Sequence, residues 1–356
     1  MKNINAIEVL SKYKNILWPE IEKHLNLIKN IPDFCKIDSK YDSLVNLHSQ
    51  MVSDYPKRKG KYLRPTLLML TAQSLGFSLD KSLFTAASMQ ISEDWILNHD
   101  DIEDQSLERR GQPALHQIYG KELALNAGDA LHVLMWQVLS KNYSILDPKI
   151  AQSIEDEFFL MLNKTIIGQT IEIKWTQDNR FDLTQEDIFL ILESKTGYYT
   201  IAGPMRLGAI LAGASETQLN SIYRFGVLLG RSFQIIDDLL DLTSDFSGQK
   251  KQQGNDIYEG KRTIMLIHLL NNISGSDLSK LKTILAKNRD DKTQDEVNWV
   301  IQKMVEKGSL EYSKKLAKEF ATQAQSIFDQ ELNFLNKEPF RSELQSIFDF
   351  IITRDH

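Results

Sequence analysis

The chain has 356 residues, of which 42% are hydrophobic and 25% charged, an ordinary globular composition that excludes wholesale disorder. Glycine and proline are scarce, with 17 and 8 residues, which favours helices and argues against a β-sandwich. The net charge of −6, without a dense block of Lys or Arg, argues against a nucleic-acid partner. The single cysteine, Cys35, excludes an internal disulfide framework. The sequence lacks an apolar run of 18 residues, so we expect no transmembrane helix. We therefore expect a soluble, cytoplasmic protein.

Helical periodicity runs along most of the chain, and the alternation typical of strands is scarce. Near the N-terminus apolar residues recur at spacings of three and four, at Ile7, Leu10, Tyr13, Leu17 and Ile21. The segment 278–351 repeats apolar positions among Lys and Glu, which predicts three or four surface helices. We therefore expect an all-α fold in one domain over 1–356, with residues 1–40 as an N-terminal helical extension.

Three polar segments interrupt this periodicity. They are 54–60 (DYPKRKG), 105–113 (QSLERRGQP) and 244–263 (SDFSGQKKQQGNDIYEGKRT). Because each is rich in turn-forming and charged residues, we expect loops there. Two of these segments follow closely on aspartate-rich motifs.

Two short motifs place three aspartates in the spacing D-D-x-x-D. The first cluster is Asp100, Asp101 and Asp104, and the second is Asp237, Asp238 and Asp241. On a helix, residues i and i+4 lie on the same face, so each motif gathers carboxylates in one patch. Such charges repel unless a cation bridges them, and Mg²⁺ prefers a few carboxylates together with substrate phosphates. Two copies, each inside an apolar run, favour a metal site over a merely solvated acidic helix face.

Cationic side chains that suit a phosphate group lie near both clusters. They are Lys61 and Arg64 in GKYLRP, Arg109 and Arg110 after the first cluster, Lys195 beside Thr196, and Lys251 and Lys261 after the second cluster. Arginine offers phosphate a bidentate fork, and lysine a point charge. The sequence contains no P-loop and no H-E-x-x-H zinc motif. We expect His99, next to Asp100, to have a packing or hydrogen-bonding role.

In chain order these residues resemble a known family, the trans-isoprenyl diphosphate synthases (polyprenyl synthetases), in particular short-chain members such as farnesyl and geranylgeranyl diphosphate synthases. The resemblance spans about residues 60–261 and continues more weakly to Arg354. It rests on Gly60-Lys61-x-x-Arg64-Pro65, His99-Asp100-Asp101-x-x-Asp104, Arg109-Arg110-Gly111-x-Pro113, Gly128-Asp129, Gly168-Gln169, Lys195-Thr196, Phe233-Gln234-x-x-Asp237-Asp238-x-x-Asp241 and Gly260-Lys261-x-Thr263.

The resemblance implies helices of the isoprenoid synthase type around a deep central cavity, usually in a homodimer. It implies an enzyme that elongates an allylic diphosphate (dimethylallyl, geranyl or farnesyl) with isopentenyl diphosphate and uses Mg²⁺, three ions per active site. It also implies residue roles. Asp100, Asp104 and Asp237 would bind Mg²⁺, supported by Asp101, Asp238 and Asp241; Arg109, Lys195, Lys251 and Lys261 would contact the allylic diphosphate; Lys61, Arg64 and Arg110 would bind isopentenyl diphosphate; Thr196 and Gln234 would face the reacting carbons. The expected catalytic residues are Asp100, Asp104, Asp237, Lys195 and Arg109.

One position departs from the family pattern. Seven residues before Asp100 the family usually has His or Gln in contact with isopentenyl diphosphate, whereas this chain has Glu93. A carboxylate beside a diphosphate is unfavourable unless it is protonated or paired with Lys61 or Arg64. We expect Glu93 to alter the affinity for isopentenyl diphosphate, either as an opposing charge or as a positioning partner of those cations.

Two further residues bear on product length. Trp95 and Ile96 lie five and four residues before Asp100, about one helical turn along the chain. In the resembled family a bulky aromatic residue at this position is the floor that stops the growing tail. This implies a C15 to C20 product, with geranylgeranyl diphosphate favoured because Ile96 is not a second aromatic. The alternative for Trp95 is a core residue that faces a neighbouring helix.

Two other functions compete with a prenyl elongase. A class I terpene cyclase-like lyase shares the first cluster, but Lys61, Arg64 and the second D-D-x-x-D argue against it. A non-catalytic subunit of a heteromeric prenyl synthase typically loses one aspartate cluster, whereas this chain keeps both. The sequence shows no nucleophile and base, and the elongation reaction needs none if the released pyrophosphate takes the proton.

Overall fold

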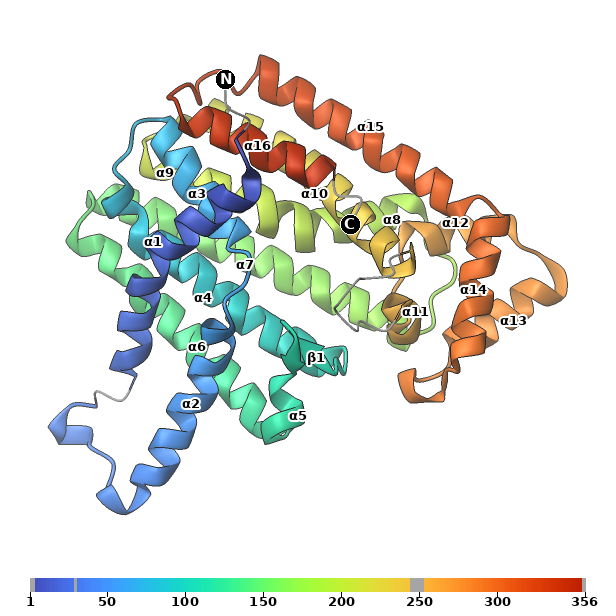
Figure 1. Ribbon diagram of the computed structural model, residues 1–356, viewed down its shortest axis with the longest axis horizontal. Helices are drawn as coiled ribbons and strands as arrows, with labels where there is room; N and C mark the ends of the chain where they lie inside the picture. Colours follow the sequence, from blue (N-terminus) through green and yellow to red (C-terminus); the bar gives the residue numbers. More distant parts are fainter. Residues whose placement is uncertain (1–3, 29–30, 244–252, 354–356) are drawn as a thin grey trace. The chain divides into compact units, whose positions relative to one another are not determined.

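The computed structural model describes residues 4–28, 31–243 and 253–353 (Figure 1). These residues are overwhelmingly helical, which confirms the predicted all-α fold. Their strands amount to one short antiparallel pair, β1 (Glu108–Arg109) with β2 (Gln112–Pro113). Within the described ranges, every helix is too short or too polar to cross a membrane.

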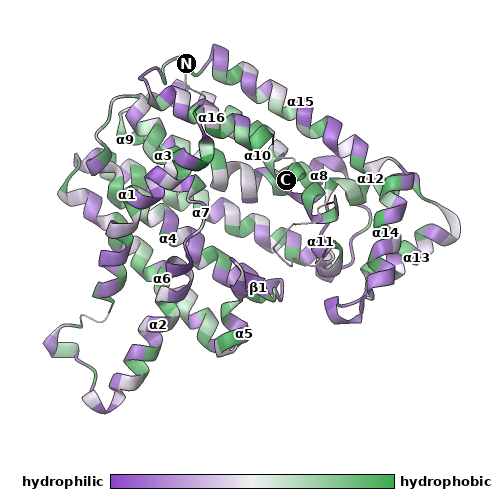
Figure 2. Ribbon diagram, in the orientation of Figure 1, coloured by the Kyte–Doolittle hydropathy of each residue, from purple (hydrophilic) through white to green (hydrophobic). Residues whose placement is uncertain are grey.

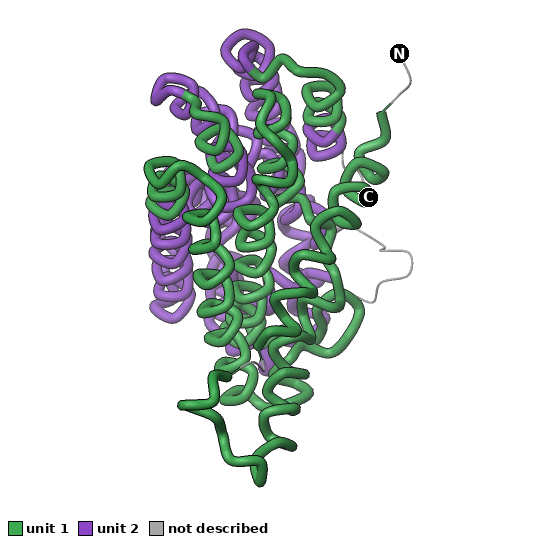
Figure 3. Tube along the Cα trace, turned by 90° about the vertical axis from the view of Figure 1, so that its left-hand side faces the viewer, with its two compact units in different colours: residues 1–157, 207–214, 335–346 green, residues 158–206, 215–334, 347–356 purple. Residues whose placement is uncertain are grey.

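The chain groups into two compact units, coloured separately in Figure 3. Unit 1 comprises 1–157, 207–214 and 335–346, and unit 2 comprises 158–206, 215–334 and 347–356. The expectation of a single domain over 1–356 stays a prediction.

Unit 1 is built mainly from the first half of the chain. Its elements are α1 (Ala6–Leu27), η1 (Asp33–Cys35), η2 (Ser39–Tyr41), α2 (Asp42–Arg58), α3 (Leu63–Ser74), α4 (Leu79–Glu103), the β1–β2 hairpin, α5 (Leu115–Tyr119), α6 (Lys121–Leu139), η3 (Ser140–Ser144) and the first residues of α7 (Pro148–Gln177). The N-terminal residues expected to form an extension thus contain one long helix, α1, and two 3₁₀ turns.

Helix α1 is attached to unit 1 by its apolar stripe. The side chain of Asn5 caps its first turn by accepting a hydrogen bond from the backbone of Ile7. Tyr13, Leu17 and Ile21 are fully buried, and the helix packs against α2, α3 and α4. The periodicity noted in the sequence is therefore the face of α1 that the core covers.

Helix α4 is the central element of unit 1 and carries the first aspartate cluster. It is buried on most sides, and its most extensive contact is with α6. At the contact of these two helices, a Cβ at Gly128 would lie 2.4 Å from Nε2 of His99, so a side chain there would displace the His99 ring. The motif glycine Gly128 is therefore explained by packing against α4.

Unit 2 contains most of the second half of the chain. Its elements are the remainder of α7, α8 (Gln185–Ile191), the π-helix η4 (Leu192–Ala202), α9 (Gly203–Leu211), α10 (Glu216–Thr243), α11 (Asn255–Glu259), α12 (Ile264–Asn272), α13 (Gly275–Leu285), η5 (Arg289–Asp291), α14 (Gln294–Glu306), α15 (Ser309–Gln330) and α16 (Phe340–Ile352). The boundaries between the units fall inside α7, α9 and α16.

Helix α10 carries the second cluster and packs closely against η4 and α15. A Cβ at Gly230 would lie 2.3 Å from Cα of Gly197, so only glycines allow this crossing of α10 and η4. The predicted surface helices over 278–351 are α13, α14, α15 and α16. Figure 2 shows hydrophilic and hydrophobic residues mixed along α15, as expected for a helix with one buried face.

The predicted loop at 54–60 is wrong for most of its length, because α2 continues to Arg58. Tyr55 and Pro56 are buried in this last turn, and Arg58 pairs with Asp54 at 2.6 Å. These contacts hold the turn although Pro56 removes one helical hydrogen bond. The segment 105–113 contains the β1–β2 hairpin. In 244–263, residues 244–252 lie outside the described residues and Asn255–Glu259 form α11.

Candidate active site

The first cluster lies at the C-terminal end of α4. Asp101 is fully buried, whereas Asp100 and Asp104 are partly exposed. Nε of Arg109 donates to both carboxylate oxygens of Asp101 at 3.0 Å, and the hydroxyl of Tyr55 donates to Oδ2 at 2.5 Å. Arg109 also lies 3.9 Å from Oδ2 of Asp100. The structure thus brings the first cluster and Arg109 together, as the sequence predicts.

The contacts of Asp101 change the protonation behaviour of its partners. Burial would lower the pKa of Arg109, but the hydrogen bonds and charge of Asp101 raise it above its ordinary value. Burial raises the pKa of Tyr55, and the charge of Asp101 raises it further. Asp101 is therefore a buried carboxylate whose charge is compensated within the protein.

The remaining carboxylates of the first cluster suit a hard cation. Asp100 and Asp104 lie one helical turn apart, and oxygen donors of this kind are the ligands that Mg²⁺ prefers. No group of three or more acidic, His or Cys side chains in the described ranges is arranged to hold a metal ion by itself. Two carboxylates one turn apart are a donor set that suits Mg²⁺, which takes few protein ligands.

Four charged side chains gather beside the first cluster in unit 1. Nη1 of Arg110 donates to Oδ1 of Asp94 at 2.8 Å, and its Nη2 lies 3.6 Å from Glu93. Nη1 of Arg64 lies 3.3 Å from the other oxygen of Glu93. Glu93 is therefore paired with Arg64, one of the two partners expected for it. Lys61 is exposed in the segment that precedes α3.

Trp95 packs on α6, and its side chain is 7% exposed. Its ring stacks on His132, with centroids 4.1 Å apart and planes 18° apart, and Nε1 of Trp136 donates to Nε2 of His132 at 2.9 Å. Ile96 is half-buried. Nε2 of His99 lies 3.3 Å from the carbonyl of Leu125, which confirms the hydrogen-bonding role expected for it.

The second cluster lies near the C-terminal end of α10 in unit 2. Asp237 is exposed, Asp241 is half-buried and Asp238 is buried. Nε2 of Gln234 donates to Oδ1 of Asp238 at 2.8 Å, and Oγ1 of Thr196 donates to Oε1 of Gln234 at 2.7 Å. This chain of hydrogen bonds joins three of the predicted site residues across η4 and α10.

Burial raises the pKa of Asp238 to about 7, and the charges of Asp237 and Glu172 add to this effect while the bond from Gln234 opposes it. Lys195, on η4, forms an ion pair with Glu172 on α7. Unit 2 therefore places a lysine and several carboxylates around Gln234. The excess of negative charge at this site favours the binding of a cation.

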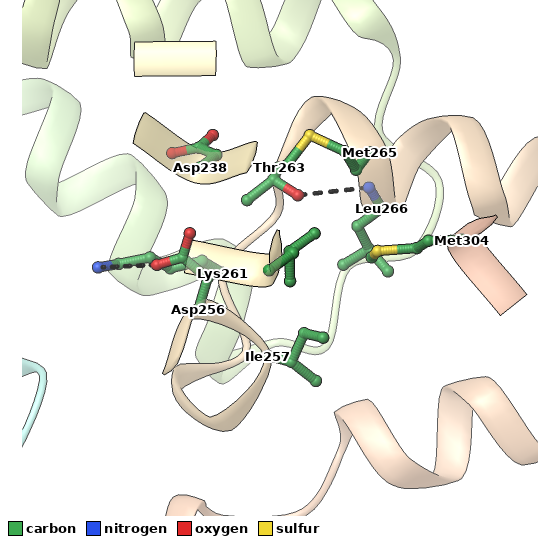
Figure 4. A pocket seen from close by; sticks show the side chains of 9 residues that line it. Asp238, Asp256, Ile257, Lys261, Thr263, Met265, Leu266 and Met304 are labelled. Atoms are coloured by element: carbon green, nitrogen blue, oxygen red, sulfur yellow. Dashed lines mark hydrogen bonds and ion pairs between the residues drawn. The ribbon is translucent and has the colours of Figure 1, made fainter. Parts of the chain in front are cut away.

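A small pocket adjoins the second cluster (Figure 4). Asp238, Asp256 and Lys261 line one part of it, and Met265, Leu266 and Met304 are among its apolar walls. Lys261 pairs with Glu259 at 2.6 Å and lies 3.8 Å from Asp256. Lys251 lies outside the described residues.

Asp256 is tied to the second cluster itself. Its backbone N–H donates to Oδ2 of Asp241 at 3.1 Å. Burial raises the pKa of Asp256 well above its ordinary value, an effect opposed by Lys261 and strengthened by Asp238 and Asp241. Asp256 therefore adds a further carboxylate to those of the second D-D-x-x-D motif.

Five residues in these sites escaped the sequence analysis: Tyr55, Asp94, His132, Glu172 and Asp256. Asp94 stands next to Glu93, and Asp256 sits in a glycine-flanked segment near Lys261, so both had a local signal. The other three, Tyr55, His132 and Glu172, contact site residues on a different helix. Because sequence spacing relates only residues of one helix, it could not identify them.

Comparison with known proteins adds to this geometry. The family described as polyprenyl synthetase matches residues 45–304. Geranylfarnesyl diphosphate synthase of Natronomonas pharaonis is 30% identical over 315 residues, which cover 83% of this chain and 87% of that protein. Geranylgeranyl diphosphate synthase of Methanosarcina mazei is 29% identical over 297 residues, covering 83% and 86% respectively.

Among solved structures, a geranylgeranyl pyrophosphate synthase from Corynebacterium glutamicum, complexed with isoprenyl diphosphate and magnesium, has a TM-score of 0.84. The match covers 97% of this chain and 99% of that one, at 23% identity. At this identity the likeness shows the fold, which is that of the isoprenoid synthases.

Proposed function

The chain belongs to the polyprenyl synthetase family and is a trans-prenyltransferase, and we propose that it condenses isopentenyl diphosphate with an allylic diphosphate. The allylic substrate is dimethylallyl, geranyl or farnesyl diphosphate. The product is an all-trans prenyl diphosphate of C15 to C20, with geranylgeranyl diphosphate favoured.

The arrangement around Asp101 carries this proposal. Arg109 and Tyr55 compensate the one fully buried carboxylate of the first cluster. Asp100 and Asp104 flank it as oxygen donors, and Arg109 also lies within 3.9 Å of Asp100. A guanidinium beside a pair of carboxylates suits a ligand that brings both phosphate oxygens and divalent cations.

Magnesium, three ions in this proposal, would neutralise the allylic diphosphate and make it a better leaving group. Asp100, Asp104 and Asp237 would hold these ions, and Asp101, Asp238 and Asp241 would support them. The resemblance assigns Arg109, Lys195, Lys251 and Lys261 to the allylic diphosphate, which they would contact. Lys61, Arg64 and Arg110 bind the diphosphate of isopentenyl diphosphate.

The side chains orient the reaction rather than take part in bond formation. The allylic carbon–oxygen bond breaks, the alkene of isopentenyl diphosphate attacks the cation, and the released pyrophosphate takes the proton that is lost. Gln234 accepts from Thr196 and donates to Asp238, so its amide is fixed in one orientation. In our proposal Thr196 and Gln234 face the reacting carbons and stabilise the positive charge.

Product length is set in this proposal by Trp95 and Ile96. Stacking on His132 of α6 holds the indole of Trp95 in one position. This packing also fits the alternative of a core residue that faces a neighbouring helix; in our proposal the fixed ring stops the growing tail. The relative from Natronomonas pharaonis is named for a product one isoprene unit longer than geranylgeranyl diphosphate. A C25 product is therefore the nearest competing outcome.

We also propose a homodimer. Four large apolar side chains of α7 are exposed in two pairs seven residues apart: Phe159, Leu160, Ile166 and Ile167. They line up on one face of the helix, and an exposed apolar stripe of this kind suits a second copy of the chain. Light scattering with size-exclusion chromatography tests this, and a monomer at micromolar concentration would contradict it. The cytoplasmic location stays a prediction.

The decisive experiment incubates the purified protein with Mg²⁺, isopentenyl diphosphate and each allylic diphosphate in turn, and identifies the product by mass. We expect C15 or C20 diphosphates and no turnover after chelation of the metal. A hydrocarbon formed from the allylic diphosphate alone would indicate a terpene cyclase-like lyase. No product with any primer would indicate a non-catalytic subunit.

A further inference from the structure

Two neighbouring carboxylates on α4, Glu93 and Asp94, face the same guanidinium. Arg110 comes from the β1–β2 hairpin and Arg64 from the first turn of α3. Asp94 is 1% exposed and Glu93 9% exposed. The reaction proposed above gives Asp94 no role, although it is the more deeply buried of the two.

Asp94 holds Arg110 tightly. Nη1 of Arg110 donates to Oδ1 of Asp94 and to the backbone carbonyl of Tyr55, each at 2.8 Å. These two bonds fix one edge of the guanidinium plane. They do so although the backbone of Arg110 is left-handed, with φ of 55°, a conformation that is unfavourable for arginine.

Glu93 is held loosely by comparison. Its oxygens lie 3.3 Å from Arg64 and 3.6 Å from Arg110, longer than the roughly 2.7–2.9 Å of a charge-assisted hydrogen bond. Oε2 of Glu93 and Nη2 of Arg110 are buried, and neither has a hydrogen-bond partner among the described residues. The same holds for the hydroxyl of Tyr62, in the segment that also contains Lys61. Buried polar atoms without a hydrogen-bond partner are unfavourable, and a ligand that supplied a partner after a small shift of the side chains would remove this cost.

Gly60 also lies close to Arg110. A Cβ at Gly60 would lie 2.9 Å from Nη2 of Arg110, so a side chain at this position would push against the guanidinium, and the motif glycine avoids this. Phosphate oxygens are the natural ligands of a guanidinium edge. The carboxylate of Glu93 is an anion near the same two guanidinium groups, Arg64 and Arg110, that a phosphate would bind.

We propose that the two carboxylates have opposite roles in binding isopentenyl diphosphate: Asp94 is a positioning residue that orients Arg110, and Glu93 competes with the incoming diphosphate for Arg64 and Arg110. This inference rests on the proposed function, which places the second diphosphate at those arginines. Glu93 thereby weakens the binding of isopentenyl diphosphate without affecting the allylic substrate. Asp94 strengthens it.

The test compares Glu93→Gln and Asp94→Asn with wild type in steady-state kinetics, varying each substrate in turn. Glu93→Gln keeps the shape of the side chain and removes its charge. We expect the KM for isopentenyl diphosphate to fall about three- to tenfold, as for the loss of one partly screened charge interaction, with the allylic KM unchanged. Asp94→Asn should raise the same KM and lower the melting temperature.

Two controls separate the outcomes. Glu22→Gln, an identical substitution at an exposed position of α1, should leave both KM values unchanged. If Asp94→Asn does not fold, Asp94→Glu keeps the charge but displaces the carboxylate, and it should still raise the KM for isopentenyl diphosphate.

An unchanged or raised KM for isopentenyl diphosphate in Glu93→Gln overturns the role of Glu93 as a competitor. An unchanged KM in both Asp94 variants overturns the positioning role of Asp94. Absence of any condensation by the wild-type enzyme contradicts the proposed function instead, so the two failures are distinguishable.

Discussion

The two aspartate clusters have the same sequence pattern but different surroundings. In the first, the buried Asp101 receives hydrogen bonds from a guanidinium and a phenol, Arg109 and Tyr55. In the second, the buried Asp238 receives one from the neutral amide of Gln234, and burial raises its pKa to about 7. A shared motif therefore does not imply a shared electrostatic state. A guanidinium donates directly to the buried carboxylate of the first cluster, whereas at the second the charge of Lys261 lowers the pKa of Asp238 without outweighing burial. We therefore expect the second cluster to depend more on a bound cation.

The largest expected effect comes from removing an outer carboxylate of either cluster. Asp100→Ala and Asp237→Ala should each lower kcat by roughly a hundredfold or more. Each would remove a ligand of the Mg²⁺ that offsets the negative charge developing on the departing pyrophosphate. Stability should change little, since both side chains are partly or fully exposed. Steady-state kinetics with saturating Mg²⁺ and a thermal melt check both points. Near wild-type turnover in either variant would remove the metal-site proposal.

Removal of the compensating groups should distinguish the clusters in stability. Arg109→Ala leaves Asp101 buried and charged, which should lower the free energy of unfolding by about 3 kcal/mol. Gln234→Ala removes only a neutral donor from Asp238, so we expect a loss of about 1 kcal/mol. Urea unfolding without metal measures both values. Equal losses of unfolding free energy in the two variants would contradict the proposed difference in charge compensation between the clusters.

Stabilisation by Mg²⁺ should depend more on the second cluster than on the first. Mg²⁺ in moderate excess over its dissociation constant should raise the Tm of the wild-type protein by about 2–4 °C. Asp237→Ala should lose more of this shift than Asp100→Ala, because Arg109 already supplies positive charge at the first cluster. Thermal melts with and without Mg²⁺ check this, with Ca²⁺ as a second oxygen-seeking ion. A greater loss in Asp100→Ala would reverse our interpretation.

The smallest expected effect on turnover concerns product length, which the proposal links to the first cluster only. Trp95→Ala should leave turnover measurable and shift products to C25 or longer, because it removes the ring that stacks on His132. Phe233→Ala, four residues before Asp237, is the matched change on α10 and should leave the product length unchanged. Mass analysis of the products decides. An unchanged distribution in Trp95→Ala would mean that another residue stops the chain.

Local patterns in the sequence predicted much of the fold and part of the site. Apolar spacing identified α1 and the helices after 278, because helix formation with one covered face follows from residues three and four apart. The same local geometry placed Asp100 near Asp104 and Asp237 near Asp241. Where local signals conflicted with packing, the sequence misled, as at 54–60, where burial of Tyr55 keeps α2 helical beyond Asp54.

The sequence by itself thus determined that the chain is helical, that it carries two D-D-x-x-D clusters, and that cations accompany them. Only the tertiary structure decided which carboxylates are compensated and by what. Tyr55 on α2 donates to Asp101 on α4, Lys195 on η4 pairs with Glu172 on α7, and Asp94 on α4 holds Arg110 of the β1–β2 hairpin. These pairings join residues far apart in the chain. Their distances and burial, which set charge and pKa, exist only once the helices have packed.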